Sequence, residues 1–234
     1  MDGLLLVDKP VGCTSHDIVA RVRRALKIRA VGHAGTLDPF ASGLLILGIG
    51  KGTKALTALV GADKKYEVTI KLGERTETFD SEGAVTVRMS PELVPPTEDK
   101  IQAALAPFRG TFSQKAPLYS AKKLNGVPLY KLARAGEATE ELRPSKEVTI
   151  FSLEIISYQW PLLELSVHCS SGTYIRSLAD DLGEALGTYG HAVQLRRAMI
   201  GERHVKDALP GNALTAELIQ AALIPLVKEE PTIS

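Results

Sequence analysis

The stretch Gly32-His-Ala-Gly-Thr-Leu-Asp-Pro-Phe-Ala-Ser-Gly-Leu-Leu-Ile-Leu-Gly-Ile-Gly50 joins a glycine-punctuated loop to an apolar segment. Residues 43–50 have the continuous apolar pattern of a strand that is buried on both faces. In the loop before it, residues 32–39, glycines permit tight turns and Pro39 restricts Asp38 to extended conformations. The stretch therefore indicates a carboxylate held in a cleft, although Asp-Pro is also a common turn dipeptide.

Strand and helix patterns interleave on both sides of this stretch. Alternating and short apolar runs predict strands over residues 4–7, 66–72 and 163–169. Helical spacing, capping residues and flanking Pro or Gly predict helices over residues 15–26, 97–108, 128–136 and 175–186, and a final helical segment over about 213–227. A connecting hairpin or loop is expected over residues 82–96. The expected fold class is therefore α+β, a mixed α/β arrangement.

Composition excludes several classes of protein. The chain has 234 residues, 44% of them hydrophobic and 24% charged, which is typical of a globular domain and argues against disorder or a coiled coil. We expect one domain, residues 1–234. The formal net charge is only +1, so any basic surface must be local. The N-terminus lacks a basic flank and a long apolar run, which predicts a cytoplasmic protein with no membrane segment.

Two familiar ligand-binding patterns are not matched. Cys13 and Cys169 stand alone, with no CxxC pair and no HExxH motif, so neither a zinc site nor a disulfide scaffold is expected. The glycines at 48, 50 and 52 fit neither a Walker loop nor a dinucleotide fingerprint. A turn at the end of a strand explains these glycines equally well, and nucleoside triphosphate binding is disfavoured.

Several polar residues allow both a functional and an ordinary interpretation. A basic run without acids suits a phosphate backbone or is a solvated helix face; it consists of Arg21, Arg23, Arg24, Lys27 and Arg29. Arg176 could reach a cleft carboxylate or form an i, i+4 pair with Asp180. Tyr66 could stack on a base or belong to the core.

Taken in order, the motifs resemble those of the bacterial tRNA pseudouridine-55 synthases, the TruB family. The resembling stretches span residues 3 to about 197. They are Gly3-Leu-Leu-Leu-Val-Asp-Lys-Pro10, Gly32-His-Ala-Gly-Thr-Leu-Asp-Pro39, Lys64-Lys-Tyr66, Thr76-Glu-Thr-Phe-Asp-Ser-Glu-Gly83, Pro117-Leu-Tyr-Ser-Ala-Lys122, His168-Cys-Ser-Ser-Gly-Thr-Tyr-Ile-Arg176 and Leu195-Arg-Arg197. The resemblance implies the pseudouridine-synthase fold, a mixed and largely antiparallel sheet flanked by helices and loops, with a central RNA-binding cleft.

The resemblance also implies roles for particular residues. Asp38 matches the catalytic aspartate, and Arg176 matches the arginine that pairs with it. The substrate-binding set would further comprise His33, Tyr66, Tyr174 and Leu195. Among these, Tyr66 would stack on the extruded uracil, and His33 would take the place of the flipped base in the T loop. No cofactor and no metal would be needed.

The implied activity is isomerisation of uridine 55 in the T loop of tRNA, after base flipping, with the T arm of tRNA as partner. We expect a monomer with no obligatory protein partner. Most members of the family continue into a C-terminal RNA-binding module, commonly a PUA domain, which is not expected here. An alternative is a tRNA-binding RNA chaperone that uses the same cleft without needing catalysis.

Overall fold

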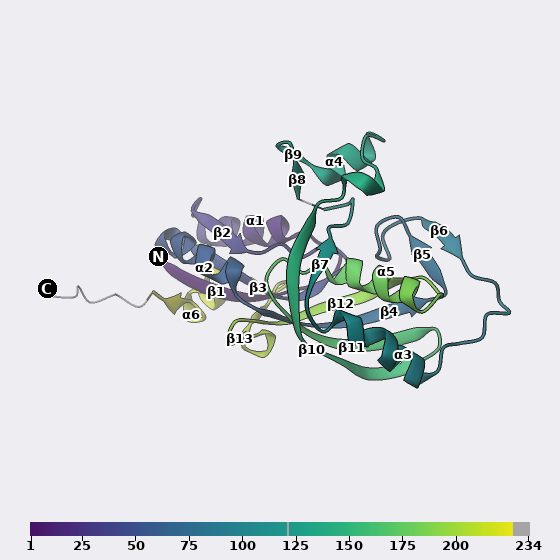
Figure 1. Ribbon diagram of the computed structural model, residues 1–234. Helices are drawn as coiled ribbons and strands as arrows, with labels where there is room; N and C mark the ends of the chain where they lie inside the picture. The colour runs from purple at the N-terminus through teal and green to yellow at the C-terminus, as the bar shows by residue number, and fades with distance from the viewer. Residues whose placement is uncertain (121, 227–234) are drawn as a thin grey trace, which may run out of the picture. The chain divides into compact units, whose positions relative to one another are not determined.

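The computed structural model describes residues 1–120 and 122–226, and the chain divides into two compact units. Unit 1 is discontinuous, because it combines Met1–Ala62 with the segment that begins at Arg196. Unit 2 is the continuous segment Asp63–Leu195 between them. Figure 1 shows the chain coloured by residue number, with the purple and yellow ends in unit 1 and the teal and green middle in unit 2.

Unit 1 is a small sheet covered by helices. Its elements are β1 (Gly3–Lys9), α1 (Ser15–Leu26), β2 (Val31–Ala34), β3 (Ser42–Ile49), η1 (Gly50–Ala55), α2 (Leu56–Gly61), β13 (Arg203–His204), η4 (Val205–Asp207), β14 (Leu209–Pro210), α6 (Ala216–Ala221) and β15 (Ile224–Pro225). β3 pairs antiparallel with β1 and, on its other edge, with β2. The late strands β14 and β15 both pair with β1, so the two chain segments of unit 1 share one sheet.

Alternate side chains of β1 and β3 enter two separate cores. Leu5, Val7, Leu45 and Leu47 pack with the apolar side of α1, whereas Leu4, Leu6, Leu44 and Ile46 pack with α2. This two-sided burial explains the continuous apolar pattern of β3. α1 begins at a capping box, in which Thr14 and Asp17 bond to each other's backbone and side chain, and its C-cap is Lys27 in the left-handed region.

Unit 2 is built on long antiparallel strands. Its elements are β4 (Lys64–Leu72), β5 (Glu74–Thr76), β6 (Val85–Arg88), α3 (Glu98–Leu105), η2 (Ala106–Phe108), β7 (Gly110–Lys115), β8 (Lys123–Leu124), β9 (Val127–Pro128), α4 (Leu129–Arg134), η3 (Glu140–Leu142), β10 (Ser145–Gln159), β11 (Leu162–Cys169) and α5 (Ile175–Ala185). β11 pairs antiparallel with β4 and β10, and β10 pairs antiparallel with β7. α5 packs on β4 and also contacts α3.

Strand β12 (Gly190–Ile200) belongs to both units along its length. Its residues up to Leu195 are part of unit 2, and from Arg196 it is part of unit 1, where Arg196 and Arg197 pair with Ser42 and Gly43 of β3. The predicted strands over 4–7, 66–72 and 163–169 are confirmed, as are helices within 15–26, 97–108, 128–136 and 175–186.

Two predictions about local structure need correction. The loop expected over 32–39 begins as strand, because Gly32 and His33 pair with Gly48 and Leu47 of β3. The final helix is shorter than expected: α6 ends at Ala221, and Ile224 and Pro225 form a strand against β1. Residue 227, the expected end of that helix, lies outside the described residues. None of the helices in the described part of the chain is long and apolar enough to cross a membrane.

Candidate active site

The loop that carries Asp38 is fixed by a buried arginine of unit 1. The Arg197 side chain is almost fully buried, and its Nε donates to the Leu44 carbonyl at 2.7 Å. Its two terminal nitrogens donate to the carbonyls of Gly35 and Thr36, at 3.2 and 3.3 Å. A buried guanidinium needs such acceptors, and here they are the backbone of the loop itself. Arg197 therefore determines where the loop can lie.

This contact requires glycine at position 43. Gly43 has φ +106°, and a Cβ atom there would lie 2.4 Å from the Arg197 carbonyl oxygen. The close approach of two backbones next to a positive φ excludes any larger residue without movement of the strands. Gly43 is thus explained by the close pairing of β3 with Arg197 of β12.

A second set of hydrogen bonds holds the loop from the other side. The Ser15 hydroxyl accepts from the Leu37 amide at 2.8 Å and lies 3.2 Å from the Leu37 carbonyl oxygen. The Gly12 amide donates to the Pro39 carbonyl at 2.8 Å. Asp38 stands between these two anchored residues, half-buried, and its own carbonyl accepts from the Ala41 amide at 3.1 Å. The carboxylate is therefore carried on backbone fixed at both neighbouring positions.

Charged side chains around β1 complete this part of unit 1. Lys9 is fully buried, and its Nζ donates to the carbonyls of Pro10 and Cys13, at 2.9 and 2.7 Å. Arg196 forms a two-point ion pair with Asp8, with nitrogen to oxygen distances of 2.7 and 3.1 Å. Asp8, Lys9, Arg196 and Arg197 lie within stretches that carry the resemblance, but no individual role followed for them from the sequence. The sequence feature that could have pointed to them is that charged residues stand directly beside apolar strand residues.

His33 offers an unsatisfied ring nitrogen next to the loop. It lies on β2 opposite Leu47 of β3, and its Nδ1 is buried without a hydrogen-bond partner among the described residues. Burial, and then the nearby positive charge of Arg197, lower the pKa of His33 below its usual value. The imidazole is therefore neutral at pH 7. A buried polar atom without a partner is costly, so this position suits contact with a ligand.

In unit 2, Arg176 is a buried candidate residue with several hydrogen-bond partners. It is the second residue of α5 and is 5% exposed. Its Nη1 donates to the Thr78 carbonyl at 2.8 Å and lies 3.2 Å from the Asp80 carboxylate, and its Nη2 donates to the Tyr119 carbonyl at 3.0 Å. Two chain segments, residues 78–80 and the segment of Tyr119, thus contact one guanidinium.

The partner of Arg176 is itself oriented by its own loop. Asp80 accepts hydrogen bonds from the Thr78 hydroxyl at 2.5 Å and from the Glu82 amide at 3.0 Å. Its carbonyl accepts from the Thr76 hydroxyl at 2.7 Å. The sequence analysis included residues 76–83 among the resembling stretches but missed the role of Asp80 as an orienting group. A buried aspartate flanked by hydroxyl residues was the available signal.

The ordinary interpretation of Arg176 as a partner of Asp180 is not the arrangement found. Asp180 instead pairs with Arg75 at 2.6 Å. Asp38 and Arg176 belong to different units, so their pairing, which the resemblance implies, stays a prediction.

The remaining candidates also lie in unit 2. Tyr66 is the third residue of β4, opposite Val167 of β11, and is 8% exposed. Tyr174 is the N-cap of α5, where the Gln114 amide group donates to its carbonyl at 3.0 Å and accepts from its amide at 2.8 Å. Leu195 ends this unit's part of β12 and is buried. The structure thus brings Arg176 and Tyr174 onto one turn and gives Tyr66 and Leu195 strand positions.

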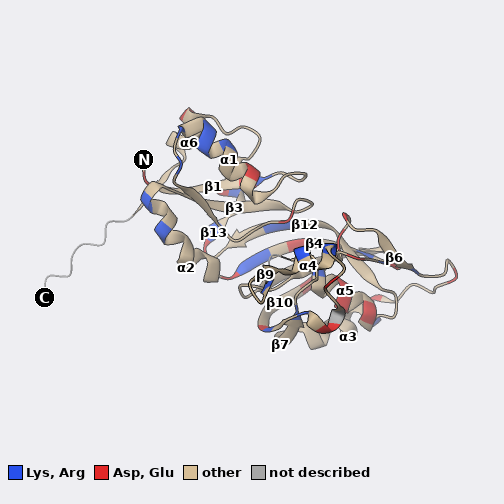
Figure 2. Cartoon of the chain, turned by 90° about the horizontal axis from the view of Figure 1, so that it is seen from above, with Lys and Arg blue, Asp and Glu red and all other residues tan. Residues whose placement is uncertain are grey.

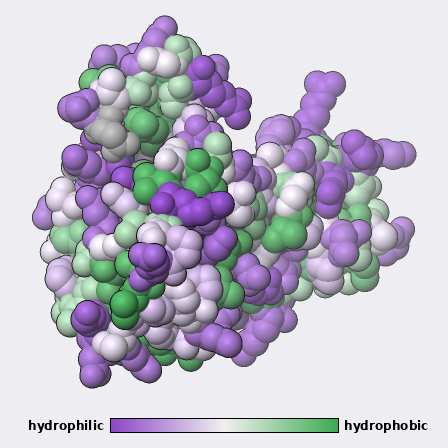
Figure 3. Space-filling view, turned by 90° about the vertical axis from the view of Figure 1, so that its right-hand side faces the viewer, coloured by the Kyte–Doolittle hydropathy of each residue, from purple (hydrophilic) through white to green (hydrophobic). Residues whose placement is uncertain are grey.

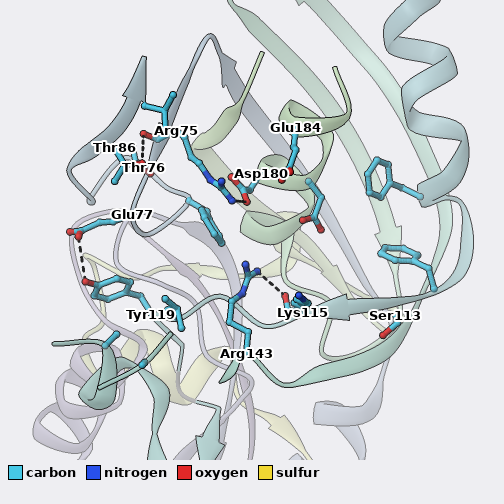
Figure 4. A pocket seen from close by; sticks show the side chains of 18 residues that line it. Arg75, Thr76, Glu77, Thr86, Ser113, Lys115, Tyr119, Arg143, Asp180 and Glu184 are labelled. Atoms are coloured by element: carbon cyan, nitrogen blue, oxygen red, sulfur yellow. Dashed lines mark hydrogen bonds and ion pairs between the residues drawn. The ribbon is translucent and has the colours of Figure 1, made fainter. Parts of the chain in front are cut away.

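A pocket of about 820 Å³ opens in unit 2. Figure 4 shows Arg75, Asp180 and Glu184 along one wall, with Glu77, Tyr119 and Arg143 opposite. The Tyr119 hydroxyl donates to Glu77 at 3.4 Å, and Arg75 and Arg143 lie over the Phe79 ring at 5.2 and 5.1 Å. These contacts hold residues 76–80, so the pocket walls also support the loop that orients Arg176.

Two adjacent carboxyl groups that line the pocket, those of Asp180 and Asp181, have raised pKa values. Burial raises the pKa of Asp180 and of Asp181 to about 6, against the opposing effect of nearby arginines. Well below the ordinary carboxyl pKa of 3.8, both carboxyls are neutral in the folded and in the unfolded chain. As the pH rises from about 4 to 6, the unfolded chain ionises more readily, so these groups make the fold progressively less stable.

We therefore expect Asp181→Asn to stabilise the protein at pH 7.5 by about 1–2 kcal/mol, since Asp181 is half-exposed and its shift is partly screened. The gain should vanish near pH 4, where the native carboxyl is also neutral. Urea denaturation of both proteins at pH 4, 6 and 7.5 measures this. A gain of equal size at all three pH values would contradict it.

Neither an activated Cys169 thiol nor a metal-binding cluster is found among the described residues. Burial raises the pKa of the Cys169 thiol to about 11, which leaves it protonated at neutral pH. Within residues 1–120 and 122–226 there is no group of three or more His, Cys, Asp or Glu side chains placed to hold a metal ion. Residues 50–55, the rejected phosphate loop, form the short helix η1.

Comparison with known proteins finds relatives along the whole chain. A family model described as "TruB family pseudouridylate synthase (N terminal domain)" matches residues 23–175. Proteins named tRNA pseudouridine synthase B are similar to the chain: that of Opitutus terrae is 45% identical and covers 100% of this chain and 96% of its own. That of Bordetella avium is 42% identical, and the match covers 99% of this chain and 94% of the relative. That of Haemophilus influenzae is 45% identical, and the match covers 92% of this chain and 68% of the relative.

Solved structures give the same result. A protein in a Cbf5–Nop10–Gar1 complex superposes with a TM-score of 0.67 at 28% identity, covering 89% of this chain and 52% of that one. A chain of an H/ACA RNP bound to a substrate RNA containing 2′-deoxyuridine gives 0.66 at 26% identity, covering 91% and 52%. The chain thus spans about half the length of these solved proteins. The mixed, mostly antiparallel fold is that of the pseudouridine synthases. Within that class, the chain belongs to the TruB family.

Proposed function

We propose that the protein is a tRNA pseudouridine synthase that isomerises uridine 55 in the T loop of tRNA. The observation that carries this proposal is the 45% identity to a tRNA pseudouridine synthase B over the whole chain, which includes the Asp38 loop and the Arg176 network. We further propose that it acts in the cytoplasm, as a monomer, on the T arm and without an obligatory protein partner. Asp38 would be catalytic, and His33, Tyr66, Tyr174, Arg176 and Leu195 would bind substrate.

The surface supports a polar partner. On the face drawn in Figure 3, hydrophilic side chains predominate among the described residues, and apolar ones form small separate groups. Broad apolar patches are the usual mark of a stable protein interface. This face therefore suits a charged partner such as RNA better than a second protein.

The isomerisation requires one reactive carboxylate and a uracil that is held outside its stack. The bond from the sugar C1′ to N1 of uracil breaks, the base rotates, a bond from C1′ to C5 forms, the C5 proton leaves to solvent and N1 takes up a proton. Asp38 could add to the sugar, add to C6 of the base, or remove a sugar proton to give a glycal. The base must first leave its stack, at a cost of a few kcal/mol that aromatic stacking on Tyr66 and contact with His33 would offset.

Release of tritium from C5 tests this function directly. A full tRNA transcript and a T-arm hairpin, each labelled at C5 of uridine, are mixed with the protein in chelator without added cofactor. We expect release from both RNAs, at one equivalent per uridine converted. Binding without release from either RNA would overturn the proposal and favour the chaperone alternative.

The Tyr66 ring gives a prediction that separates stacking from hydroxyl chemistry. Tyr66→Phe should bind the T-arm hairpin as the wild type does, whereas Tyr66→Leu should bind it about 5- to 100-fold more weakly, since stacking of a base on an aromatic ring contributes about 1–3 kcal/mol. Fluorescence anisotropy measures both. Equal losses in the two variants would contradict a stacking role, and a slower rate in Tyr66→Phe alone would report on the hydroxyl.

A further inference from the structure

The small net charge hides an uneven distribution between the two units. Unit 1, through residue 226, contains 12 basic and 7 acidic residues, whereas unit 2 contains 15 basic and 18 acidic ones. Between residues 18 and 62 there are seven basic residues and a single acid, Asp38. Positive charge is therefore concentrated on the segment of unit 1 that also carries the catalytic loop.

Five of these cations come together at one end of unit 1. The end of α1 supplies Arg24 and Lys27, the segment before β2 supplies Arg29, and η1 supplies Lys51 and Lys54. We call these five residues the basic end, and all of them are exposed. Figure 2 shows blue bands on α1 and on the helical segment that leads into α2.

Backbone hydrogen bonds explain this convergence. The Gly50 amide donates to the Ala30 carbonyl at 2.7 Å, which places the residue after Arg29 beside the start of η1. Val31 pairs with Ile49 in the same register. The Arg23 guanidinium donates to the Val31 carbonyl at 2.7 Å and thereby ties the last turns of α1 to the same point.

The five side chains are not used inside the protein. Arg21 and Arg23 donate to the carbonyls of Gly211 and Val31, so two members of the basic run have structural roles. By contrast, none of the basic-end side chains forms an ion pair with a carboxylate of the described residues. The helix dipole favours cations at the end of α1, but Arg29, Lys51 and Lys54 lie outside that helix. The nearby Asp2 carboxylate accepts from the Lys51 backbone amide at 2.7 Å rather than from a basic side chain.

We propose that the basic end binds the phosphate backbone of the helical stem of the tRNA T arm. The inference rests on the proposed function, because it assumes that the reacting uridine is bound at the Asp38 loop. Strand β2 begins at Val31, two residues after Arg29, and His33 is its third residue, so about 7 Å of strand separates Val31 from His33. The basic end therefore lies close to a nucleotide bound at His33, where the stem adjoins the loop.

The test is a double-mutant cycle. It removes the five cations of the basic end from the protein and, separately, the phosphate charges of the stem from the RNA. One protein variant is Arg24→Gln, Lys27→Gln, Arg29→Gln, Lys51→Gln and Lys54→Gln together. One RNA is a T-arm hairpin whose stem carries uncharged methylphosphonate linkages. Anisotropy titrations over a range of salt concentrations give the affinity of each protein for the charged and the uncharged stem.

We expect the variant to bind the charged hairpin at least about tenfold more weakly, with a salt slope smaller by about 4, since each of the five lost phosphate contacts removes about 0.7–0.9 from the slope. On the uncharged stem, variant and wild type should bind alike. In tritium release the variant should have a raised KM and an unchanged kcat. Equal affinity and slope of the two proteins on the charged stem would overturn the proposal, as would an equal loss on both stems.

Matched controls distinguish binding at the basic end from a general effect of positive charge, and distinguish failure of this inference from failure of the proposed activity. Lys51→Gln with Lys54→Gln is compared with Arg88→Gln with Lys100→Gln, which removes two exposed cations of unit 2. Only the first pair should reduce the salt slope, and equal effects would overturn the assignment. The binding cycle does not depend on turnover, so absence of tritium release by the wild type would count against the proposed function alone.

Discussion

Replacement of Asp38 by asparagine is expected to reduce tritium release from labelled tRNA to background, a loss of at least roughly 10⁴-fold. The amide keeps the shape of the side chain but cannot act as nucleophile or base. The backbone of the loop should be unchanged, because it is held by Arg197, Ser15 and Gly12 through bonds that do not involve this carboxylate. RNA affinity should therefore stay within about twofold of the wild type.

The matched control is Asp99→Asn, which removes an exposed carboxylate in the first turn of α3. It should release tritium at the wild-type rate. Full residual turnover in Asp38→Asn, after mass spectrometry has confirmed that deamidation has not restored the aspartate, would remove Asp38 from the reaction.

Arg176→Lys is expected to have the second largest effect, with turnover lowered more than about 100-fold and the free energy of unfolding reduced by about 3 kcal/mol. Lysine cannot donate at once to the Thr78 and Tyr119 carbonyls and to Asp80, because these three acceptors match a planar fork. A buried carboxylate and at least one buried carbonyl would lose their partner. Urea denaturation and single-turnover tritium release measure the two effects.

Arg88→Lys serves as the control, because the Arg88 side chain is 72% exposed and its pair with Glu74 should contribute little. Should Arg176→Lys fail to fold, Asp80→Asn keeps the volume of the partner and removes only its charge. That variant should fold and still turn over more than tenfold slower. Unchanged stability and turnover in both variants would show that this network has no role.

The regular parts of the fold were predictable because burial leaves a periodic signal in the sequence. β4 and β11 alternate apolar and polar residues, and α1 carries its apolar stripe next to a capping box. The strand character of Gly32 and His33 was not predictable, since it depends on pairing with Gly48 and Leu47, which follow later in the chain. The early end of α6 has the same cause, because pairing of Ile224 and Pro225 with β1 competes with helix continuation.

The candidate site was only partly accessible from sequence. Motif resemblance singled out Asp38, Tyr66 and Arg176, but the sequence offered no way to see that Arg197 holds the loop or that Asp80 orients Arg176. Both facts depend on hydrogen bonds to backbone carbonyls between residues far apart in the chain, and such bonds leave no periodic trace. The pairing of Asp180 with Arg75 rather than Arg176 is of the same kind.

The discontinuity of unit 1 bears on synthesis of the protein. The loop of Asp38 is made before unit 2, whereas Arg197, which holds its carbonyls, and the strands β14 and β15, which complete the sheet of β1, are made after it. The ribosome must first translate residues 63–195, which takes roughly 7–27 s at 5–20 residues per second. During that interval the nascent chain exposes an unfinished sheet and an unanchored loop. We therefore expect that a chain still attached to the ribosome cannot modify tRNA until Arg197 and the residues through Pro225 have emerged.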